Sequence, residues 1–196
     1  MKRVAIGKQS FEDIRKKDCF YIDKTDFIKD WWESTDDVTL ITRPRRFGKT
    51  LNMDMLKCFF SNQYEGRKEL FEGLDIWKDE EYRELQGTYP VIFLSFAGIK
   101  QTEYSKAVTM IKNEITDIYN KYDYIMKSDL YNNNEKIQFK SVCPDMSDEI
   151  AQKAINDLSN YLSRYYGKKV IIILDEYDTP MQEAYVNGYW EELVAF

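Results

Sequence analysis

Apolar residues gather along this chain in short runs and in longer periodic stretches, and the two patterns predict different elements. Three runs are β-branched, apolar and too short for helices: 38–42, 91–96 and 170–174. The last run, Val-Ile-Ile-Ile-Leu, is the most apolar segment of the sequence, and we expect it to be buried on both faces. The pattern predicts three buried strands.

The longer stretches repeat apolar residues three or four positions apart, as helices with one buried face do. One such stretch follows the first strand, and two separate the second strand from the third. Their apolar stripes are Leu51, Met55, Leu56, Phe59 and Phe60; Tyr104, Val108, Ile111, Ile115, Ile118 and Tyr122; and Ile150, Ala154, Ile155, Leu158, Tyr161, Leu162 and Tyr165. Strands separated by helices predict an α/β fold, with a mainly parallel sheet flanked by helices.

Two short helices are expected before the first strand. Ser10, with Asp13 three residues later, is similar to a capping box, and Thr25 precedes an acidic residue as a helix cap does. We therefore divide the chain into a helical lead-in, residues 1–36, and a core, residues 37–196.

The composition indicates a folded protein and excludes histidine chemistry. The 196 residues are 43% apolar, and 28 Lys and Arg against 34 Asp and Glu give a net charge of −6. An acidic chain is a poor general binder of nucleic acids or membrane surfaces. Because histidine is absent, Ser-His-Asp and Cys-His catalysis and His-containing zinc sites are excluded.

The cysteines and the apolar runs both favour a cytoplasmic location without a membrane partner. Cys19, Cys58 and Cys143 are too far apart for a C-x-x-C pair, and their odd number argues against a disulfide framework. No apolar run approaches the roughly 20 residues that span a bilayer. The first eight residues turn polar before a signal-peptide core could form.

A basic loop joins the first strand to the helix after it. It reads Arg43-Pro44-Arg45-Arg46-Phe47-Gly48-Lys49-Thr50, followed by Leu51, and it matches the phosphate-loop pattern G-x-x-x-x-G-K-[ST] except for Arg43 in place of the first glycine. In such a loop, backbone N–H groups surround the β-phosphate, Lys49 bridges phosphate oxygens, and the Thr50 hydroxyl binds Mg²⁺. The position between strand and helix favours a phosphate loop over a plain basic turn.

The arginines of this loop have two interpretations. Arg43, Arg45 and Arg46 are candidates for contacts with phosphate or nucleic acid, and a solvated basic loop explains them equally well. Direct binding of nucleic acid is therefore left open.

The third strand ends in Asp175-Glu176, a pattern typical of the second half of an ATPase site. Asp175 would hold Mg²⁺ through water, and Glu176 would polarise the attacking water. Both halves of the predicted site follow strands, at the edge where open α/β sheets bind ligands. An ordinary acidic strand end is the alternative. We predict Lys49 and Glu176 as catalytic residues.

A second nucleotide motif is set aside. Asn120-Lys121-Tyr122-Asp123 matches the N-K-x-D motif that recognises guanine. It lies at the end of an amphipathic helix, between the phosphate loop and the Asp-Glu strand, where the guanine motif does not belong. We interpret it as a chance match.

Four segments together resemble the bacterial AAA-ATPase-like family, from about Ile6 to the C-terminus. They are Tyr21-Ile22-Asp23-Lys24-Thr25, the segment 42–52 that contains the basic loop, Tyr89-Pro90 with the strand after it, and Leu174-Asp175-Glu176-Tyr177-Asp178-Thr179-Pro180. The resemblance implies a P-loop NTPase of the additional-strand class that uses ATP and Mg²⁺, and it implies that the missing first glycine is a family trait. Phe20 and Tyr21 are candidates for stacking on a base, with core burial as the simpler explanation.

The resemblance also implies that a part of the ATPase unit lies outside this sequence. Longer relatives often carry a C-terminal domain similar to restriction endonucleases, and Pro144-Asp145 lacks the downstream acid-x-Lys of such a nuclease. Additional-strand ATPases place a further strand between the phosphate-loop strand and the Asp-Glu strand, and nothing after Leu174 is strand-like. We expect an incomplete core that is truncated at its C-terminus.

The function expected from these observations is Mg·ATP binding with slow hydrolysis that drives a conformational change in attached or partner domains. The alternative is a nucleotide-sensing or nucleic-acid-associated regulatory module that binds without turnover. Glu176 favours hydrolysis, whereas no arginine finger or sensor residue is identifiable in the sequence.

Overall fold

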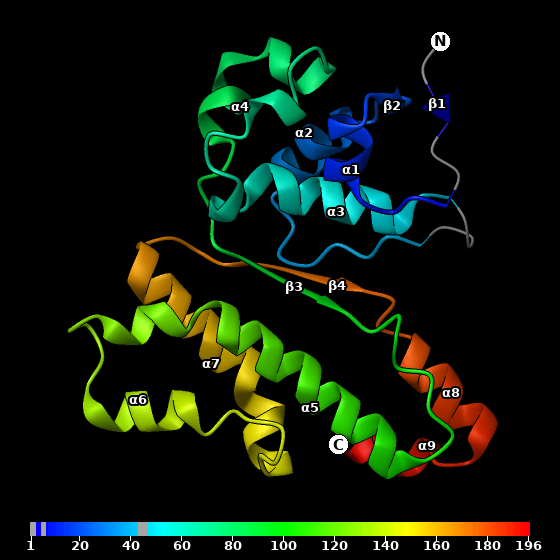
Figure 1. Cartoon of the computed structure of the whole chain (residues 1–196), viewed down its shortest axis with the longest axis vertical. Coiled ribbons are helices and arrows are strands. Elements are labelled where there is room, and N and C mark those ends of the chain that lie inside the picture. The colour runs from blue at the N-terminus through cyan, green and yellow to red at the C-terminus, as the bar shows by residue number, and fades with distance from the viewer. Residues whose placement is uncertain (1–2, 5–6, 43–46) are drawn as a thin grey trace. The chain divides into compact units, whose positions relative to one another are not determined.

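The computed structural model describes residues 3–4, 7–42 and 47–196. The chain divides into two compact units, Met1–Val91 and Ile92–Phe196 (Figure 1). The division expected from the sequence, after residue 36, stays a prediction.

The first unit is built mainly of helices and short turns. Its elements are β1 Arg3–Val4, α1 Phe11–Lys16, β2 Cys19–Phe20, α2 Asp26–Glu33, α3 Lys49–Phe60, the 3₁₀ turns η1 Asn62–Tyr64, η2 Lys68–Leu70 and η3 Asp75–Lys78, and α4 Glu80–Leu85. The two-residue strands β1 and β2 pair in parallel. The helix predicted from the apolar stripe at 51–60 is confirmed as α3.

Aromatic rings fill the core of the first unit around α3. The Phe59 ring packs edge-on against Phe60 and Phe71, with centroids 5.0 and 5.1 Å apart. Phe60 stacks on Trp32 at 5.3 Å, and Phe11 of α1 stacks on Phe71 at 5.2 Å. These contacts hold α1 and α2 against α3, the helix that follows the predicted phosphate loop.

One carboxylate lies within this aromatic core. Asp54 of α3 is buried and accepts a hydrogen bond of 2.7 Å from the backbone N–H of Phe11, the first residue of α1. A helix cannot satisfy that N–H by itself. Lys57, one turn along α3, pairs with the same carboxylate. Asp54 therefore fixes the start of α1 on α3.

The second unit combines two strands with six helical segments in its described length. Its elements are β3 Val91–Ser95, α5 Tyr104–Lys121, the 3₁₀ turn η4 Asp123–Lys127, α6 Asn133–Lys140, α7 Asp148–Tyr166, β4 Ile171–Asp175, α8 Thr179–Asn187 and α9 Trp190–Ala195. β3 and β4 form a two-stranded sheet and run in the same direction (Figure 1). The two predicted amphipathic helices are confirmed as α5 and α7.

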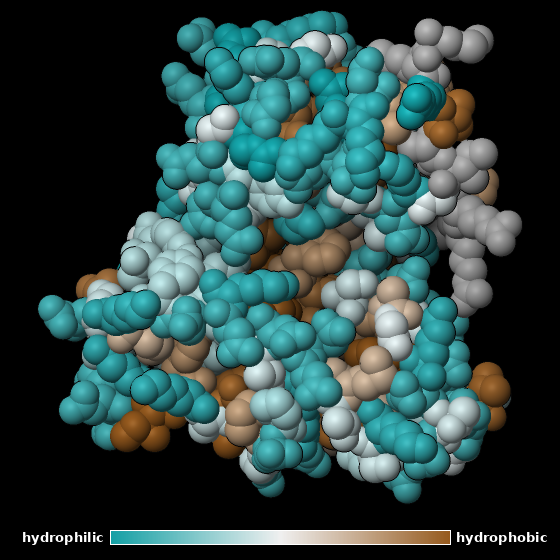
Figure 2. Space-filling model, in the orientation of Figure 1, coloured by the Kyte–Doolittle hydropathy of each residue, from teal (hydrophilic) through white to brown (hydrophobic). Residues whose placement is uncertain are grey.

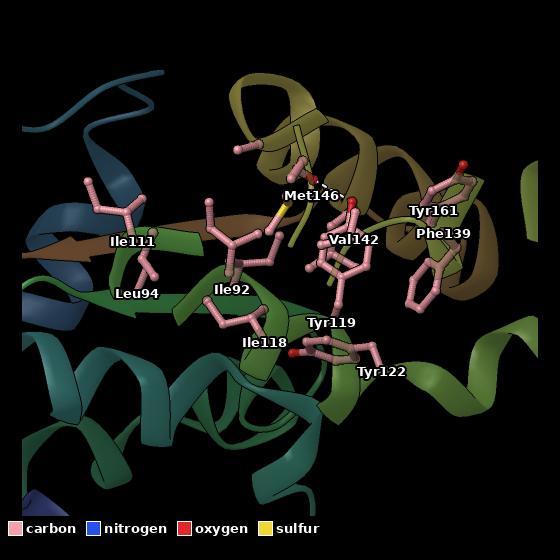
Figure 3. Close-up of a cluster of buried hydrophobic side chains, with 14 of the residues drawn as sticks. Ile92, Leu94, Ile111, Ile118, Tyr119, Tyr122, Phe139, Val142, Met146 and Tyr161 are labelled. Atoms are coloured by element: carbon pink, nitrogen blue, oxygen red, sulfur yellow. Dashed lines mark hydrogen bonds between the residues drawn. The ribbon is translucent and has the colours of Figure 1, made fainter. Parts of the chain in front are cut away.

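The core of the second unit lies between β3 and the helices α5 and α7 (Figure 3). Ile92 and Leu94 of β3 contribute the sheet side of this cluster. The buried hydroxyl of Tyr119 donates to the carbonyl of Ala154 at 2.6 Å. Burial raises the pKa of Tyr119 above its ordinary value. The hydroxyl is therefore neutral and paired inside the core.

The first predicted strand is not formed. Residues 38–42 adopt no regular structure, and the side chains of Val38 and Leu40 are 86% and 62% exposed. In the described part of the chain, no strand pairs with this segment. A β-branched run becomes a strand only when a neighbour satisfies its backbone groups, so the local signal was insufficient.

The third predicted strand is confirmed as β4, but it is not buried on both faces. Ile173 is 7% exposed, whereas Ile172 and Leu174 are 43% and 42% exposed. In the described residues β4 pairs with β3 alone, so its other edge has no strand partner there. Of the predicted three-stranded sheet, the described residues form only the pair of β3 and β4. The other two-stranded sheet, β1 with β2, lies in the part of the chain where only helices were expected.

The two predicted helix caps have different outcomes. Ser10 caps α1 as expected, because its hydroxyl accepts the N–H of Asp13 at 3.2 Å. Thr25 stands at the N-cap position of α2 but makes no capping hydrogen bond with its side chain. Its hydroxyl donates to Asp23 and accepts the N–H of Ile76 instead.

Candidate functional site

The described part of the predicted phosphate loop leads directly into α3. Gly48 lies in the left-handed region, with φ 75° and ψ 23°, which glycine adopts without the strain that a Cβ imposes. Its carbonyl accepts the N–H of Asn52 at 3.0 Å, so the helix begins at this turn. Lys49, Thr50 and Leu51 are the first three residues of α3.

The start of α3 has the electrostatic character of an anion site. The first helical N–H groups have no partner within the helix, and the helix dipole is positive at this end. Gly48 offers no capping side chain, and no acidic residue lies in the first turn. Lys49 adds a positive charge. Phe47, before Gly48, is 62% exposed, and the predicted ligands Arg43, Pro44, Arg45 and Arg46 lie outside the described residues.

The other predicted half-site lies at the end of β4. Asp175 is the last residue of the strand and is 3% exposed. Its backbone carbonyl accepts the N–H of Phe96 at 2.9 Å, which holds this strand end beside the end of β3. Asp175 thus stands at the end of a paired strand, where the sequence predicted it, and its side chain is buried. Its role as a magnesium ligand stays a prediction.

Glu176 follows with a backbone conformation that is unusual for its residue type. Its φ is 48°, and the described residues hold two other non-glycine positions with positive φ, Asp18 and Thr35. The left-handed conformation costs a residue with a Cβ about 1–2 kcal/mol. Strain of this kind gathers at functional sites, because there the surroundings impose the geometry.

The side chain of Glu176 also has a local partner. The Thr179 hydroxyl donates to its carboxylate at 3.3 Å, and the Thr179 N–H donates to its backbone carbonyl at 3.0 Å. Thr179 is the first residue of α8. Glu176 therefore contributes to the turn between β4 and α8, in addition to its candidate role with water.

The donor chemistry of the candidate ligands fits Mg²⁺. A hydroxyl from Thr50 and a carboxylate from Asp175 are hard oxygen donors, and Mg²⁺ usually binds proteins through one or two such groups together with phosphates and water. Within the described residues, no group of three or more Cys, Asp or Glu side chains could hold a metal alone. Thr50 belongs to the first unit and Asp175 to the second, so their action on one ion is a proposal.

Asp23 and Thr25, which the sequence linked to the family resemblance, have a structural role. Asp23 accepts hydrogen bonds from the Thr25 N–H at 2.9 Å, the Thr25 hydroxyl at 2.7 Å and the Asp75 N–H at 2.7 Å. Burial acts to raise the pKa of Asp23, but these donors together outweigh it and hold that pKa below its ordinary value. This network joins the start of α2 to η3. The Asp-x-Thr spacing is typical of an Asx turn, so the sequence could have predicted the hydrogen bonds between Asp23 and Thr25. It could not have predicted the bond to Asp75.

The two aromatic candidates for base stacking differ in their surroundings. Tyr21 packs edge-on against Phe11 at 5.4 Å, and its hydroxyl contacts the Met55 sulfur at 3.2 Å. Burial raises the pKa of Tyr21 to about 12. Tyr21 is thus partly buried against the core, which favours the simpler explanation. Phe20 is 54% exposed, so core burial was the wrong explanation for this ring.

The remaining sequence features agree with their expected places. Asn120 and Lys121 end α5, and Tyr122 after them is buried, so the N-K-x-D match lies on a helix end rather than after a strand. The three cysteines are free thiols, and burial raises the pKa of Cys58 to about 12. Among the described residues, no helix combines the length and the apolar character that a bilayer crossing requires.

Comparison with known proteins identifies one family. The sequence model of a family described as a predicted AAA-ATPase, AAA-ATPase-like, matches residues 5–196. A protein of Azotobacter chroococcum mcd 1, described as an uncharacterized protein in the vnfD 5′ region, is 28% identical over 181 residues. This match covers 92% of the chain but 30% of that protein, so the chain spans less than a third of its relative's length. No solved structure matches the chain.

Proposed function

Because this chain belongs to the AAA-ATPase-like family, we propose that it binds Mg·ATP and hydrolyses it slowly, and that this drives a conformational change in attached or partner domains. The observation that carries the proposal is the left-handed Gly48 at the start of α3, with Lys49 and Thr50 directly after it. This is the local geometry that places backbone N–H groups and a lysine around a phosphate.

Each candidate residue then has a role in the proposed site. The segment from Arg43 to Leu51 binds the phosphates, and Lys49 neutralises the charge on their β and γ oxygens. Thr50 and Asp175 hold Mg²⁺, which when bound stabilises the charge that develops on the phosphates. Glu176 orients the attacking water.

Two further parts of the proposal concern the surroundings of the domain. A cytoplasmic location fits the free thiols and the absence, among the described residues, of a helix able to cross a membrane. The partner domain is proposed to be C-terminal and similar to a nuclease, as the family resemblance implies. Direct contact with nucleic acid would then belong to that partner or to the basic loop.

A second candidate function is nucleotide sensing without turnover. The hydrogen bond from Thr179 to the Glu176 carboxylate favours it, since this bond gives Glu176 a purely structural use. Under this alternative ATP binding at α3 remains, and Glu176 has no part in chemistry.

Isothermal titration with Mg·ATP tests the phosphate site. We expect Lys49→Ala to weaken binding by about 10- to 100-fold or more, because it removes a charge-assisted contact with phosphate. The matched control is Lys68→Ala. Lys68 is an exposed lysine of the same unit, and its Nζ lies 3.9 Å from Oε1 of Glu72. Equal affinity for the Lys49→Ala variant and the wild type would reject the phosphate-loop assignment.

Turnover of ATP separates hydrolysis from sensing. We expect Glu176→Gln to keep ATP affinity while it lowers turnover by about 100-fold or more, since the water-orienting carboxylate is lost and the phosphate contacts remain. Thr179→Val removes the hydroxyl that donates to the Glu176 carboxylate but keeps the backbone N–H that holds the turn, so turnover should stay largely intact. Unchanged turnover in Glu176→Gln would support the sensing module instead.

A further inference from the structure

The last two helices of the second unit expose a group of apolar side chains. Tyr185 and Val186 of α8 are 76% and 79% exposed, and Trp190 and Val194 of α9 are 39% and 52% exposed. We refer to these four residues as the α8–α9 patch. Figure 2 shows brown and pale residues among the hydrophilic ones over this part of the chain.

Three members of the α8–α9 patch adjoin one another, and the fourth, Val186, follows Tyr185 in the chain. The rings of Tyr185 and Trp190 lie 6.3 Å apart, edge to face, and so join the two helices across their outer side. Trp190 and Val194 are one turn apart on α9 and therefore share a face. Single exposed apolar side chains are common on protein surfaces, whereas a contiguous apolar group indicates an interaction site.

The opposite face of the same helices already anchors them. Ala184, Tyr189 and Leu193 are buried in the core of the second unit. The Tyr189 hydroxyl donates to the Gln101 carbonyl at 2.6 Å, and the Gln152 amide donates to the Phe196 carbonyl at 2.9 Å. These contacts anchor the two helices on their inner side, and the α8–α9 patch is presented on a fixed support.

The segment that carries the α8–α9 patch bears charge of one sign. Residues 176–196 contain five acidic residues and no Lys or Arg, whereas residues 1–175 hold 28 basic and 29 acidic residues. The acidic residues of this segment are Glu176, Asp178, Glu183, Glu191 and Glu192. Nearly all of the net charge of the chain thus lies in its last 21 residues. Glu191 is exposed and adjoins Val194 one turn along α9.

We propose that the α8–α9 patch docks a protein segment that presents apolar side chains flanked by Lys or Arg. The Tyr and Trp rings supply the contact area that dominates protein interfaces, and the surrounding carboxylates attract basic partners. A second copy of the same surface would place carboxylate against carboxylate, and an anionic membrane would be repelled. Charge complementarity therefore selects a basic amphipathic partner.

The helix that carries part of the patch also contacts the candidate site. α8 begins at Thr179, whose hydroxyl and N–H both contact Glu176. A segment docked on α8 could therefore change the conformation of the turn between β4 and α8, which contains Glu176. The docking proposal itself does not depend on ATP hydrolysis and is tested by binding alone.

Fluorescence anisotropy with two labelled synthetic peptides tests the proposal at physiological salt. One peptide places leucine and lysine in an amphipathic helical pattern, and the other replaces every lysine with glutamate. We expect the wild-type protein to bind the lysine peptide and not the glutamate peptide. We also expect Trp190→Ser, and separately Glu191→Lys with Glu192→Lys, to weaken that binding by about tenfold each.

Matched substitutions outside the patch control for general effects. Ile137→Ser removes another exposed apolar side chain, on α6, and Asp117→Lys reverses another exposed charge, on α5. Both should bind the lysine peptide within about twofold of the wild type, which is under 0.5 kcal/mol. Circular dichroism and thermal unfolding confirm that each variant is folded.

Five results would overturn the proposal. Three concern the peptides: equal binding of the two peptides, no binding of the lysine peptide, and equal losses in the patch variants and their controls. The fourth is self-association of the chain that Trp190→Ser abolishes, which analytical ultracentrifugation measures and which would assign the patch to a second copy. Tight binding to vesicles of anionic lipid that Trp190→Ser abolishes would assign it to a membrane and would equally reject the basic protein partner.

Discussion

Gly87 is a residue at which backbone geometry alone excludes every side chain. Its φ is +72°, and a Cβ placed there would lie 2.6 Å from the Cα of Glu65. Its N–H donates to the Phe59 carbonyl at 2.7 Å, so the chain after α4 runs close against the end of α3 and the turn that follows. A glycine in this place lets the first unit close around its aromatic core.

We expect Gly87→Ala to destabilise the protein far more than Gly73→Ala. Gly73 also has a positive φ, +82°, but a Cβ there meets no atom within 4 Å. The control should cost about 1–2 kcal/mol for left-handed strain alone, and Gly87→Ala about 1–3 kcal/mol more for the steric clash. Urea unfolding of both variants measures the difference. Equal stability of the two would show that the close approach at Gly87 relaxes without cost.

Single residues also show which interactions the sequence could predict. The Ser10 cap and the glycine before α3 were predictable, because their partners lie within four residues along the chain. Asp54 and the hydroxyl of Thr25 were not, since they bond to Phe11 and Ile76, 43 and 51 residues away. No local pattern encodes a partner at that distance.

At the scale of elements, helices and strands differ in how far local sequence determines them. α3, α5 and α7 were predicted from their apolar stripes, because helical hydrogen bonds lie within the segment. Residues 38–42 and β4 are both rich in β-branched residues. β4 pairs with β3, whereas among the described residues no strand pairs with 38–42. Strand formation depends on a neighbour that the segment itself does not specify.

The connection between α2 and η3 gives an element-scale prediction. Asp23 joins them as a carboxylate, and its hydrogen bonds hold its pKa below the ordinary value. Its contribution to stability is therefore complete above the unfolded pKa of about 3.9 and is lost as pH falls through the lower folded pKa. We expect Asp23→Asn to lower the free energy of unfolding near neutral pH by about 1–3 kcal/mol. This difference from the wild type, the gap in stability, should narrow below about pH 4.

Urea unfolding across this acidic range measures the gap. Asp37→Asn is the control, because Asp37 is an exposed acid beyond the end of α2. It should stay close to wild type at every pH. A gap for Asp23→Asn that remains constant down to the lowest pH would mean that the carboxylate charge has no part in joining α2 to η3.

At the scale of the whole molecule, the two proposed magnesium ligands fall in different compact units. Thr50 belongs to Met1–Val91 and Asp175 to Ile92–Phe196. The local sequence identified both residues, because each belongs to a recognisable motif. It contains no information on how two separately packed units act together. Binding measurements that distinguish phosphate contacts from metal contacts address this directly.

We expect Asp175→Asn to remove the gain in ATP affinity that Mg²⁺ provides, while affinity without the metal stays as in wild type. The amide keeps the volume of the side chain but is a weaker ligand for a hard cation, and the phosphate contacts of Lys49 and the α3 N-terminus are unchanged. Titration calorimetry with ATP, in Mg²⁺ and in a chelator, measures both quantities. Asp178→Asn, an exposed acid three residues further on, should keep the magnesium gain. If Asp175→Asn kept it as well, Asp175 would be a buried strand-end acid, and the second unit would supply no ligand to the metal bound with ATP.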